Sequence, residues 1–216
     1  REEGVVLLEF ERPFDPATVG SVPLPPYIKE YHGDAERYQT VYSRDPRSAA
    51  APTAGLHFTR ELFERLSDRG VERAAVTLDV GPGTFKPVTV DDPHDHNLHS
   101  EHVSLPQPTA EAITRAKAEH RRIVAVGTTV VRTLEHVARE RGAVEPYEGW
   151  TGLRILPGDS FSVVDVLITN FHLPRSTLLM LVSALAGTDF VLAAYREAVA
   201  QRYRFYSFGD AMLVLP

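Results

Sequence analysis

Two hydrophobic periods alternate along the chain, and their order predicts the architecture. Short apolar runs between turn residues predict strands at 74–80, 123–127, 161–169 and 210–215. Stretches with helical spacing predict helices at 59–70, 109–122, 128–142, 177–187 and 189–203. The segment 123–127 is apolar throughout, which is typical of a strand buried on both faces. This alternation predicts an α/β layered domain with a largely parallel central sheet, whose ligands bind beyond the carboxyl ends of the strands.

Capping residues define the predicted helix ends. Thr59 is expected to cap its helix, with Phe58 and Phe63 as a hydrophobic staple and Gly70 as the stop. Thr109 is expected to cap the second helix.

The N-terminal part has a different composition. A strand is predicted at 4–10, but no obvious hairpin mate follows it. Five prolines and one glycine between 13 and 27 predict a linker, and hence a domain boundary. We therefore expect the chain to be a fragment whose upstream part, including the partners of this strand, is missing.

Composition limits the classes of function. The 216 residues contain no cysteine, which excludes disulfides, thiolate catalysis and cysteine-based zinc sites. The longest apolar run, 178–187, is too short to span a bilayer and predicts a buried helix. A net charge of −6 argues against binding nucleic acid by bulk electrostatics, although 23 Lys and Arg residues allow a local basic face.

One group of polar residues follows the strand at 123–127. Gly127, Thr128 and Thr129 form a strand-to-helix turn whose free N–H groups suit a carboxylate or phosphate. Arg132 lies one turn further and can pair with the same anion. The alternative is that Thr128 is an N-cap and Arg132 a solvated helix residue.

A second group follows the strand at 161–169. Asn170 and His172 stand in the loop before the next helix, where His172 is either an acid/base group or a structural histidine that binds loop carbonyls. Asp165 interrupts an apolar strand, and a buried carboxylate needs a partner. His57 lies in a turn before a helix whose cap and staple leave the imidazole free to act.

The segment 91–102 is rich in histidine. Four histidines and Glu101 lie within nine residues: His94, His96, His99 and His102. Neutral imidazoles suit Zn, Fe or Ni, but the spacing is not that of a helical metal motif, and histidine-rich loops are often solvated. A compact acid/base element at 99–101 is the other interpretation.

Eight stretches, in order from Val22 to Pro216, resemble one family. They are "VPLPPYIKE", "ERYQTVYS", "AAPTAGLHFT", "VGPGTF", "HNLHSE", "IVAVGTTVVRTLE", "VVDVLITNFHLPRSTLLMLVSALAG" and "YRFYSFGDAMLVLP". Together they resemble the S-adenosylmethionine:tRNA ribosyltransferase-isomerases of queuosine biosynthesis. The resemblance implies that residues 1–22 are the last part of a small β-barrel domain with its linker, and that 23–216 form the α/β catalytic domain.

The resemblance also implies a reaction. The ribosyl group of S-adenosylmethionine moves to 7-aminomethyl-7-deazaguanine at the wobble position of tRNA and isomerises, giving epoxyqueuosine, adenine and methionine. S-adenosylmethionine is then a consumed substrate, no metal or other cofactor is needed, and the protein is expected to be a cytoplasmic monomer without a membrane partner. Because the sulfonium acidifies the ribose 5′ carbon, the site needs a base there, a donor for adenine and an anchor for the methionine carboxylate.

The resemblance implies the following site residues. The catalytic candidates are His57, His99, Glu101, His172 and Asp165. The substrate-binding candidates are Thr53, Gly55, Gly83, Thr84, Phe85, Thr128, Thr129, Arg132, Asn170 and Asp210. The chain departs from the family pattern at Val130, where a serine is usual, at Asp79, where a histidine is usual, and at Pro82, where a leucine is usual.

Two alternatives remain at this point. The first is a catalytically silent relative that binds tRNA or a nucleotide, suggested by these departures. The second is a metal-dependent hydrolase that uses the histidines of 94–102.

Overall fold

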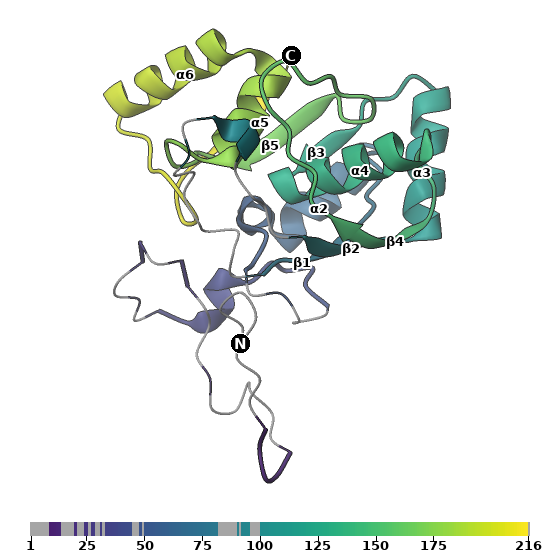
Figure 1. Ribbon diagram of the computed structural model, residues 1–216, viewed down its shortest axis with the longest axis horizontal. Coiled ribbons are helices and arrows are strands. Elements are labelled where there is room, and N and C mark those ends of the chain that lie inside the picture. Colours follow the sequence, from purple (N-terminus) through teal and green to yellow (C-terminus); the bar gives the residue numbers. More distant parts are fainter. Residues whose placement is uncertain are drawn as a thin grey trace.

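The computed structural model describes residues 9–13, 20, 24–25, 27–28, 31, 33–44, 48, 50–81, 90, 92–95 and 100–215. In these residues it is a mixed α/β fold with two small sheets (Figure 1). The α-helices are α2 (Arg60–Ser67), α3 (Gln107–Ala118), α4 (Thr128–Arg141), α5 (Thr177–Ala186) and α6 (Thr188–Ala200). Short 3₁₀ helices are η1 (Ala35–Tyr38), η2 (Thr53–His57) and η4 (Pro93–Asp95). Most of the strand expected at 4–10 lies outside the described residues.

The first sheet is antiparallel. Its strands β1 (Thr77–Asp79), β2 (Glu101–Leu105) and β4 (Tyr147–Thr151) stand in the order β1-β2-β4. Val103 of β2 pairs with Leu78 on one side and Gly149 on the other. The sequence did predict β1, at 74–80, but neither β2 nor β4.

The second sheet carries the strands that were expected. Its order is β3-β5-β6, with β3 (Val124–Val126), β5 (Val166–Asn170) and β6 (Ala211–Val214). β3 and β5 are parallel, whereas β6 returns antiparallel to β5. The prediction of a largely parallel central sheet is therefore wrong for the described strands, because β3 and β5 form their one parallel pair.

Helix α4 joins the two sheets, since it contacts β2 and β4 of one and β3 and β5 of the other (Figure 1). Its apolar side chains Val131, Leu134 and Val137 are buried in a continuous core. The fully buried Glu135 carboxylate accepts hydrogen bonds from the backbone N–H groups of three residues of the loop before β5: Ser162, Val163 and Val164. These bonds satisfy a buried charge and fix the loop that leads into β5.

Most of the predicted helix ends are confirmed. Thr59 Oγ1 accepts a hydrogen bond from Leu62 N at 3.2 Å, and the rings of Phe58 and Phe63 stack with centroids 5.3 Å apart. α4 ends at Gly142, whose φ of 75° is the left-handed conformation that glycine adopts at low cost.

Three local predictions are wrong. Thr109 lies inside α3, which begins after Pro106, and its hydroxyl donates to Ala75 O at 2.7 Å. Thr128 is the first residue of α4 and not its cap, since Gly127 stands at that position. β3 is not buried on both faces, because the side chain of Val124 is 49% exposed.

Helices α5 and α6 are the most apolar pair. No single helix in the described part of the chain is long and apolar enough to cross a membrane; these two meet the length and composition criteria only together, with a bend of 115° between them.

Candidate functional site

The centre of the candidate site is the contact between η2 and the end of β5. Asn170, the last residue of β5, is 3% exposed. Thr53 Oγ1 donates to Asn170 Oδ1 at 3.1 Å, and Asn170 Nδ2 lies 3.1 Å from His57 Nε2. A buried amide thus holds both ends of η2, while the His57 side chain is exposed.

The strand-to-helix turn at 127–129 lies beside this contact. Gly127 has a φ of 91°, and its N–H donates to Ile168 O of β5 at 2.8 Å. A Cβ at Gly127 would lie 3.7 Å from the Ala54 Cβ of η2. α4 therefore begins next to η2, and its first N–H groups have no side-chain cap.

A large cleft runs past these groups. Its volume is about 2200 Å³. Its lining includes most of the candidate residues on η2, the turn and β5: Thr53, Thr128, Thr129, Arg132, Asn170 and His172. His57 does not line the cleft. It forms a hydrogen bond with Asn170, which is a lining residue. The predicted gathering of polar side chains at the strand ends is present.

Gly55 serves packing within this site. A Cβ on Gly55 would overlap the Tyr42 hydroxyl and would lie 2.9 Å from Thr40 Cγ2. The absence of a side chain at Gly55 thus lets the side chains of Tyr42 and Thr40 pack against the backbone of η2. Tyr42 is a residue that sequence reasoning missed, since nothing in its local pattern indicates a contact with η2.

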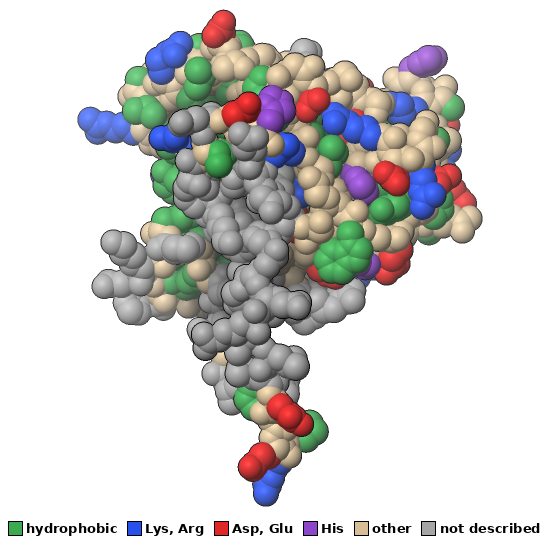
Figure 2. Space-filling model, viewed as in Figure 1, with side chains coloured by type: hydrophobic (Ala, Val, Ile, Leu, Met, Phe, Trp, Pro, Cys, Tyr) green, Lys and Arg blue, Asp and Glu red, His purple; other side chains and the backbone are tan. Residues whose placement is uncertain are grey.

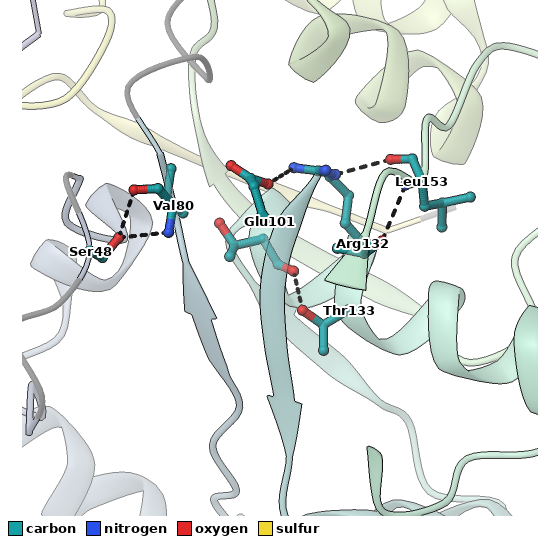
Figure 3. A network of polar contacts seen from close by, with 8 residues as sticks. Ser48, Val80, Glu101, Arg132, Thr133 and Leu153 are labelled. Atoms are coloured by element: carbon teal, nitrogen blue, oxygen red, sulfur yellow. Dashed lines mark hydrogen bonds and ion pairs between the residues drawn. The ribbon is translucent and has the colours of Figure 1, made fainter. Parts of the chain in front are cut away.

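Arg132 and Glu101 form a buried ion pair (Figure 3). Arg132 Nη1 donates to Glu101 Oε2 at 2.5 Å, and Arg132 Nε donates to Leu153 O at 3.1 Å. Their side chains are 12% and 5% exposed, and the buried Nη2 of Arg132 has no hydrogen-bond partner. The predicted anion clamp and a predicted acid/base group therefore bind each other, so Arg132 is not an open cation in this structure.

His172 lies in the loop after β5, as predicted. Its Nε2 is 2.9 Å from Thr169 Oγ1, and its backbone N–H donates to the Tyr195 hydroxyl at 2.8 Å. Burial lowers the pKa of His172 to about 4 and raises that of Tyr195 to about 12. His172 is thus a neutral imidazole at physiological pH. Tyr195, which comes from α6, gave no signal in the sequence.

Asp210 lies just before β6, on the side of His57. It accepts hydrogen bonds from Arg204 N at 2.8 Å and from Arg204 Nη2 at 2.6 Å. These bonds lower the pKa of Asp210, and the nearby His57 acts weakly in the same direction. Asp210 is therefore a carboxylate already engaged by an arginine.

Asp165 is not at the site. It lies exposed before the start of β5, whereas Asn170 lies at the other end of that strand. Its Oδ2 accepts a hydrogen bond from Ile123 N at 2.7 Å. The expectation of a buried carboxylate is wrong, because the strand starts one residue later and Asp165 links it to the start of β3.

Four of the predicted site residues lie outside the described residues: Gly83, Thr84, Phe85 and His99. In the histidine-rich segment, the His94 side chain forms a hydrogen bond with Asp92 Oδ1. His102 lies between two carboxylates, with Nδ1 3.6 Å from Asp79 Oδ2 and Nε2 3.7 Å from Glu148 Oε1. The described residues contain no group of three side chains that could hold a metal ion, and His96 and His99 are not among them.

The departures from the family pattern have local explanations at two positions. Val130 is partly buried against the core, where an apolar side chain fits. Asp79 lies opposite His102 in the β1–β2 register, so the two side chains form a cross-strand pair of a carboxylate and an imidazole. Pro82 lies outside the described residues.

The family model described as "Queuosine biosynthesis protein" matches residues 1–214. The chain belongs to this queuosine biosynthesis family. A relative from Symbiobacterium thermophilum, an S-adenosylmethionine:tRNA ribosyltransferase-isomerase, is 62% identical over 197 residues, which cover 91% of this chain and 58% of the relative. A relative of the same name from Thermus thermophilus is 60% identical over 216 residues, covering 99% of this chain and 62% of its own length.

A solved structure of the queuosine biosynthesis family also matches. The S-adenosylmethionine tRNA ribosyltransferase from Thermotoga maritima superimposes with a TM-score of 0.64 and 52% identity, covering 75% of this chain and 51% of that chain. The mixed α/β fold is thus that of the family. The chain spans about three fifths of the length of these curated relatives.

Proposed function

We propose that the chain carries the catalytic site of an S-adenosylmethionine:tRNA ribosyltransferase-isomerase. The reaction would transfer the ribosyl group of S-adenosylmethionine to 7-aminomethyl-7-deazaguanine at the tRNA wobble position and give epoxyqueuosine, adenine and methionine. The observation that carries the proposal is the Thr53–Asn170–His57 cluster beside the open turn at 127–129, in a chain 60% identical to a relative of that name.

The geometry suggests a division of roles. The uncapped N–H groups of Thr128 and Thr129 suit the methionine carboxylate, because a helix N-terminus favours an anion. His57 and the neutral His172 are the groups that hold or receive a proton. The Arg132–Glu101 pair would support the wall of the cleft beside the N-terminus of α4. Gly83, Thr84 and Phe85 are proposed to bind the nucleoside.

The charge of the cleft supports a tRNA partner. Six arginines but only three carboxylates, those of Glu64, Glu72 and Glu101, are among its described lining residues. The arginines are Arg44, Arg73, Arg121, Arg122, Arg132 and Arg175. In the view of Figure 2, basic and acidic side chains are otherwise interspersed. Because the chain as a whole carries a net charge of −6, a polyanion such as tRNA is expected to bind at the basic cleft and not over the whole surface.

The proposal includes the remaining expectations from the resemblance. Residues 1–22 would end a small β-barrel domain, and 23–216 would form the α/β catalytic domain. S-adenosylmethionine would be consumed as a substrate without a metal or other cofactor, by a cytoplasmic monomer. His99 is proposed as a further acid/base group.

The direct test is adenine release. The purified protein is incubated with S-adenosylmethionine and tRNA bearing the aminomethyl-deazaguanine, with the Thermus thermophilus relative assayed in parallel to prove the substrates competent. Adenine, methionine and modified tRNA in equal amounts are expected. Binding of the tRNA without adenine release, while the relative turns over, would overturn the proposal in favour of a silent binding protein.

A further inference from the structure

We propose that the buried Asn170 amide holds His57 as the neutral tautomer protonated at Nδ1. In this form His57 is a hydrogen-bond donor to an acceptor atom of the substrate and not the base of the reaction. Asn170 and Thr53 would then be positioning residues. The role of His57 as a donor in the reaction rests on the proposed function, whereas the assignment of its tautomer does not.

The orientation of the amide carries the argument. Thr53 Oγ1 donates to Asn170 Oδ1, which places the Nδ2 hydrogens toward His57 Nε2 at 3.1 Å. An amide N–H can only donate, so Nε2 must accept with its lone pair. A neutral imidazole that accepts at Nε2 carries its proton at Nδ1.

The surroundings keep this arrangement rigid on one side and open on the other. Asn170 is 3% exposed and belongs to β5, between β3 and β6, so the amide has little freedom to move. The His57 side chain is exposed, which leaves its Nδ1–H accessible to a ligand. A backbone hydrogen bond also fixes the end of η2 next to His57, since Phe58 N donates to Gly55 O at 3.1 Å.

The tautomer restricts the chemistry of His57. As a base it would take a proton at Nε2, which would bring that N–H against the Asn170 N–H and break the hydrogen bond. Asp210 is a charged group that interacts with His57, but Arg204 already donates to this carboxylate from its backbone and its guanidinium. The donor at Nδ1 therefore suits an acceptor such as a purine ring nitrogen of the departing adenine, and the base must be another group.

Nitrogen NMR tests the tautomer directly. Protein labelled with ¹⁵N in its histidines is measured at pH 8, where an ordinary imidazole is neutral. The His57 signals are identified by their loss in His57→Gln. We expect Nδ1 to be protonated and Nε2 bare. A protonated Nε2 with a bare Nδ1 would overturn the proposal.

Two substitutions test the cause. In Asn170→Asp a carboxylate of the same shape faces His57 Nε2 and can only accept, so the proton is expected to move to Nε2. In Thr53→Val the amide loses its fixed orientation, and a mixture of tautomers is expected, whereas Thr53→Ser should retain the wild-type tautomer. Asp210→Asn, which alters charge near His57 but not the Nε2 contact, is the matched control and should also retain it.

The kinetics of adenine release in the same variants test whether His57 acts as a donor in the reaction. Asn170→Asp should lower kcat for adenine release by about 100-fold with little change in KM. Thr53→Ser should retain a higher kcat than Thr53→Val, because the serine keeps the hydroxyl that donates to Asn170 Oδ1. If Asn170→Asp changes the tautomer but not kcat, His57 is not a donor in the reaction. If the wild-type protein releases no adenine at all, the proposed function fails while the NMR result still decides the tautomer.

Discussion

Glu101 and Arg132 form a buried ion pair that links the first residue of β2 to α4, the helix whose N-terminus forms part of the candidate site. The guanidinium also bonds Leu153 O, just beyond β4. The pair therefore connects the antiparallel sheet to the helix at the cleft. Because both side chains are removed from water, each compensates part of the charge of the other.

Breaking this pair should cost stability. Arg132→Met is expected to lower the free energy of unfolding by about 3 kcal/mol, because Glu101 stays buried without its guanidinium. Urea denaturation followed by circular dichroism measures the loss. The double variant Arg132→Met, Glu101→Leu should recover most of it, and Arg121→Met, in an exposed pair, should cost less than about 1 kcal/mol. An unchanged unfolding midpoint in Arg132→Met, together with lost adenine release, would instead make Arg132 a substrate-binding group.

Stability should depend on the protonation of His172. Its folded pKa of about 4 lies below the unfolded value, so the unfolded chain binds a proton more readily between about pH 6.5 and 4. The contribution is present above pH 6.5 and is lost as the pH falls toward 4, by about 2.5 kcal/mol at pH 4.5.

Unfolding of the wild type and of His172→Gln at pH 7.5 and 4.5 checks this contribution. The glutamine keeps a polar group near Thr169 but does not titrate in this range. The wild type should lose more stability than the variant over this interval. Equal losses would mean that the partly buried imidazole of His172 takes up a proton as readily in the folded chain as in the unfolded one.

Gly55→Ala should destabilise η2, because the added methyl group would overlap the Tyr42 hydroxyl. We expect a loss of about 2 kcal/mol, seen as a lower unfolding midpoint. Adding Tyr42→Phe removes the overlapping oxygen and should recover about 1 kcal/mol of that loss, which a double-mutant cycle measures. Strict additivity of the two substitutions would contradict the contact.

The sequence predicted those elements whose signals are local. The cap of Thr59, the staple of Phe58 and Phe63, and the end of α4 at Gly142 are each decided by a few neighbouring residues, and all are present. The gathering of Thr128 and Asn170 at one cleft followed from a general property of strand ends, which holds here because β3 and β5 are parallel.

What the sequence did not reveal depends on distant contacts. β2 and β4 are strands because they pair with each other across more than thirty residues. β2 begins with the polar residues Glu101 and His102, so its sequence lacks the apolar alternation that predicts a strand. The exposed position of Asp165 could not be predicted, because the apolar run 161–169 has the pattern of one continuous strand, whereas the strand starts only at Val166. The partnership of Arg132 with Glu101 and of Gly55 with Tyr42 likewise joins separate parts of the chain.

Adenine release by His57→Ala tests the central claim most directly. His57 is exposed, so its removal should change stability by no more than about 0.5 kcal/mol and the melting temperature by about 2 °C. If the Asn170–His57 contact is the centre of the site, adenine release from S-adenosylmethionine in the presence of the substrate tRNA should fall by about 100-fold. Turnover within about threefold of wild type in the folded variant would contradict the account.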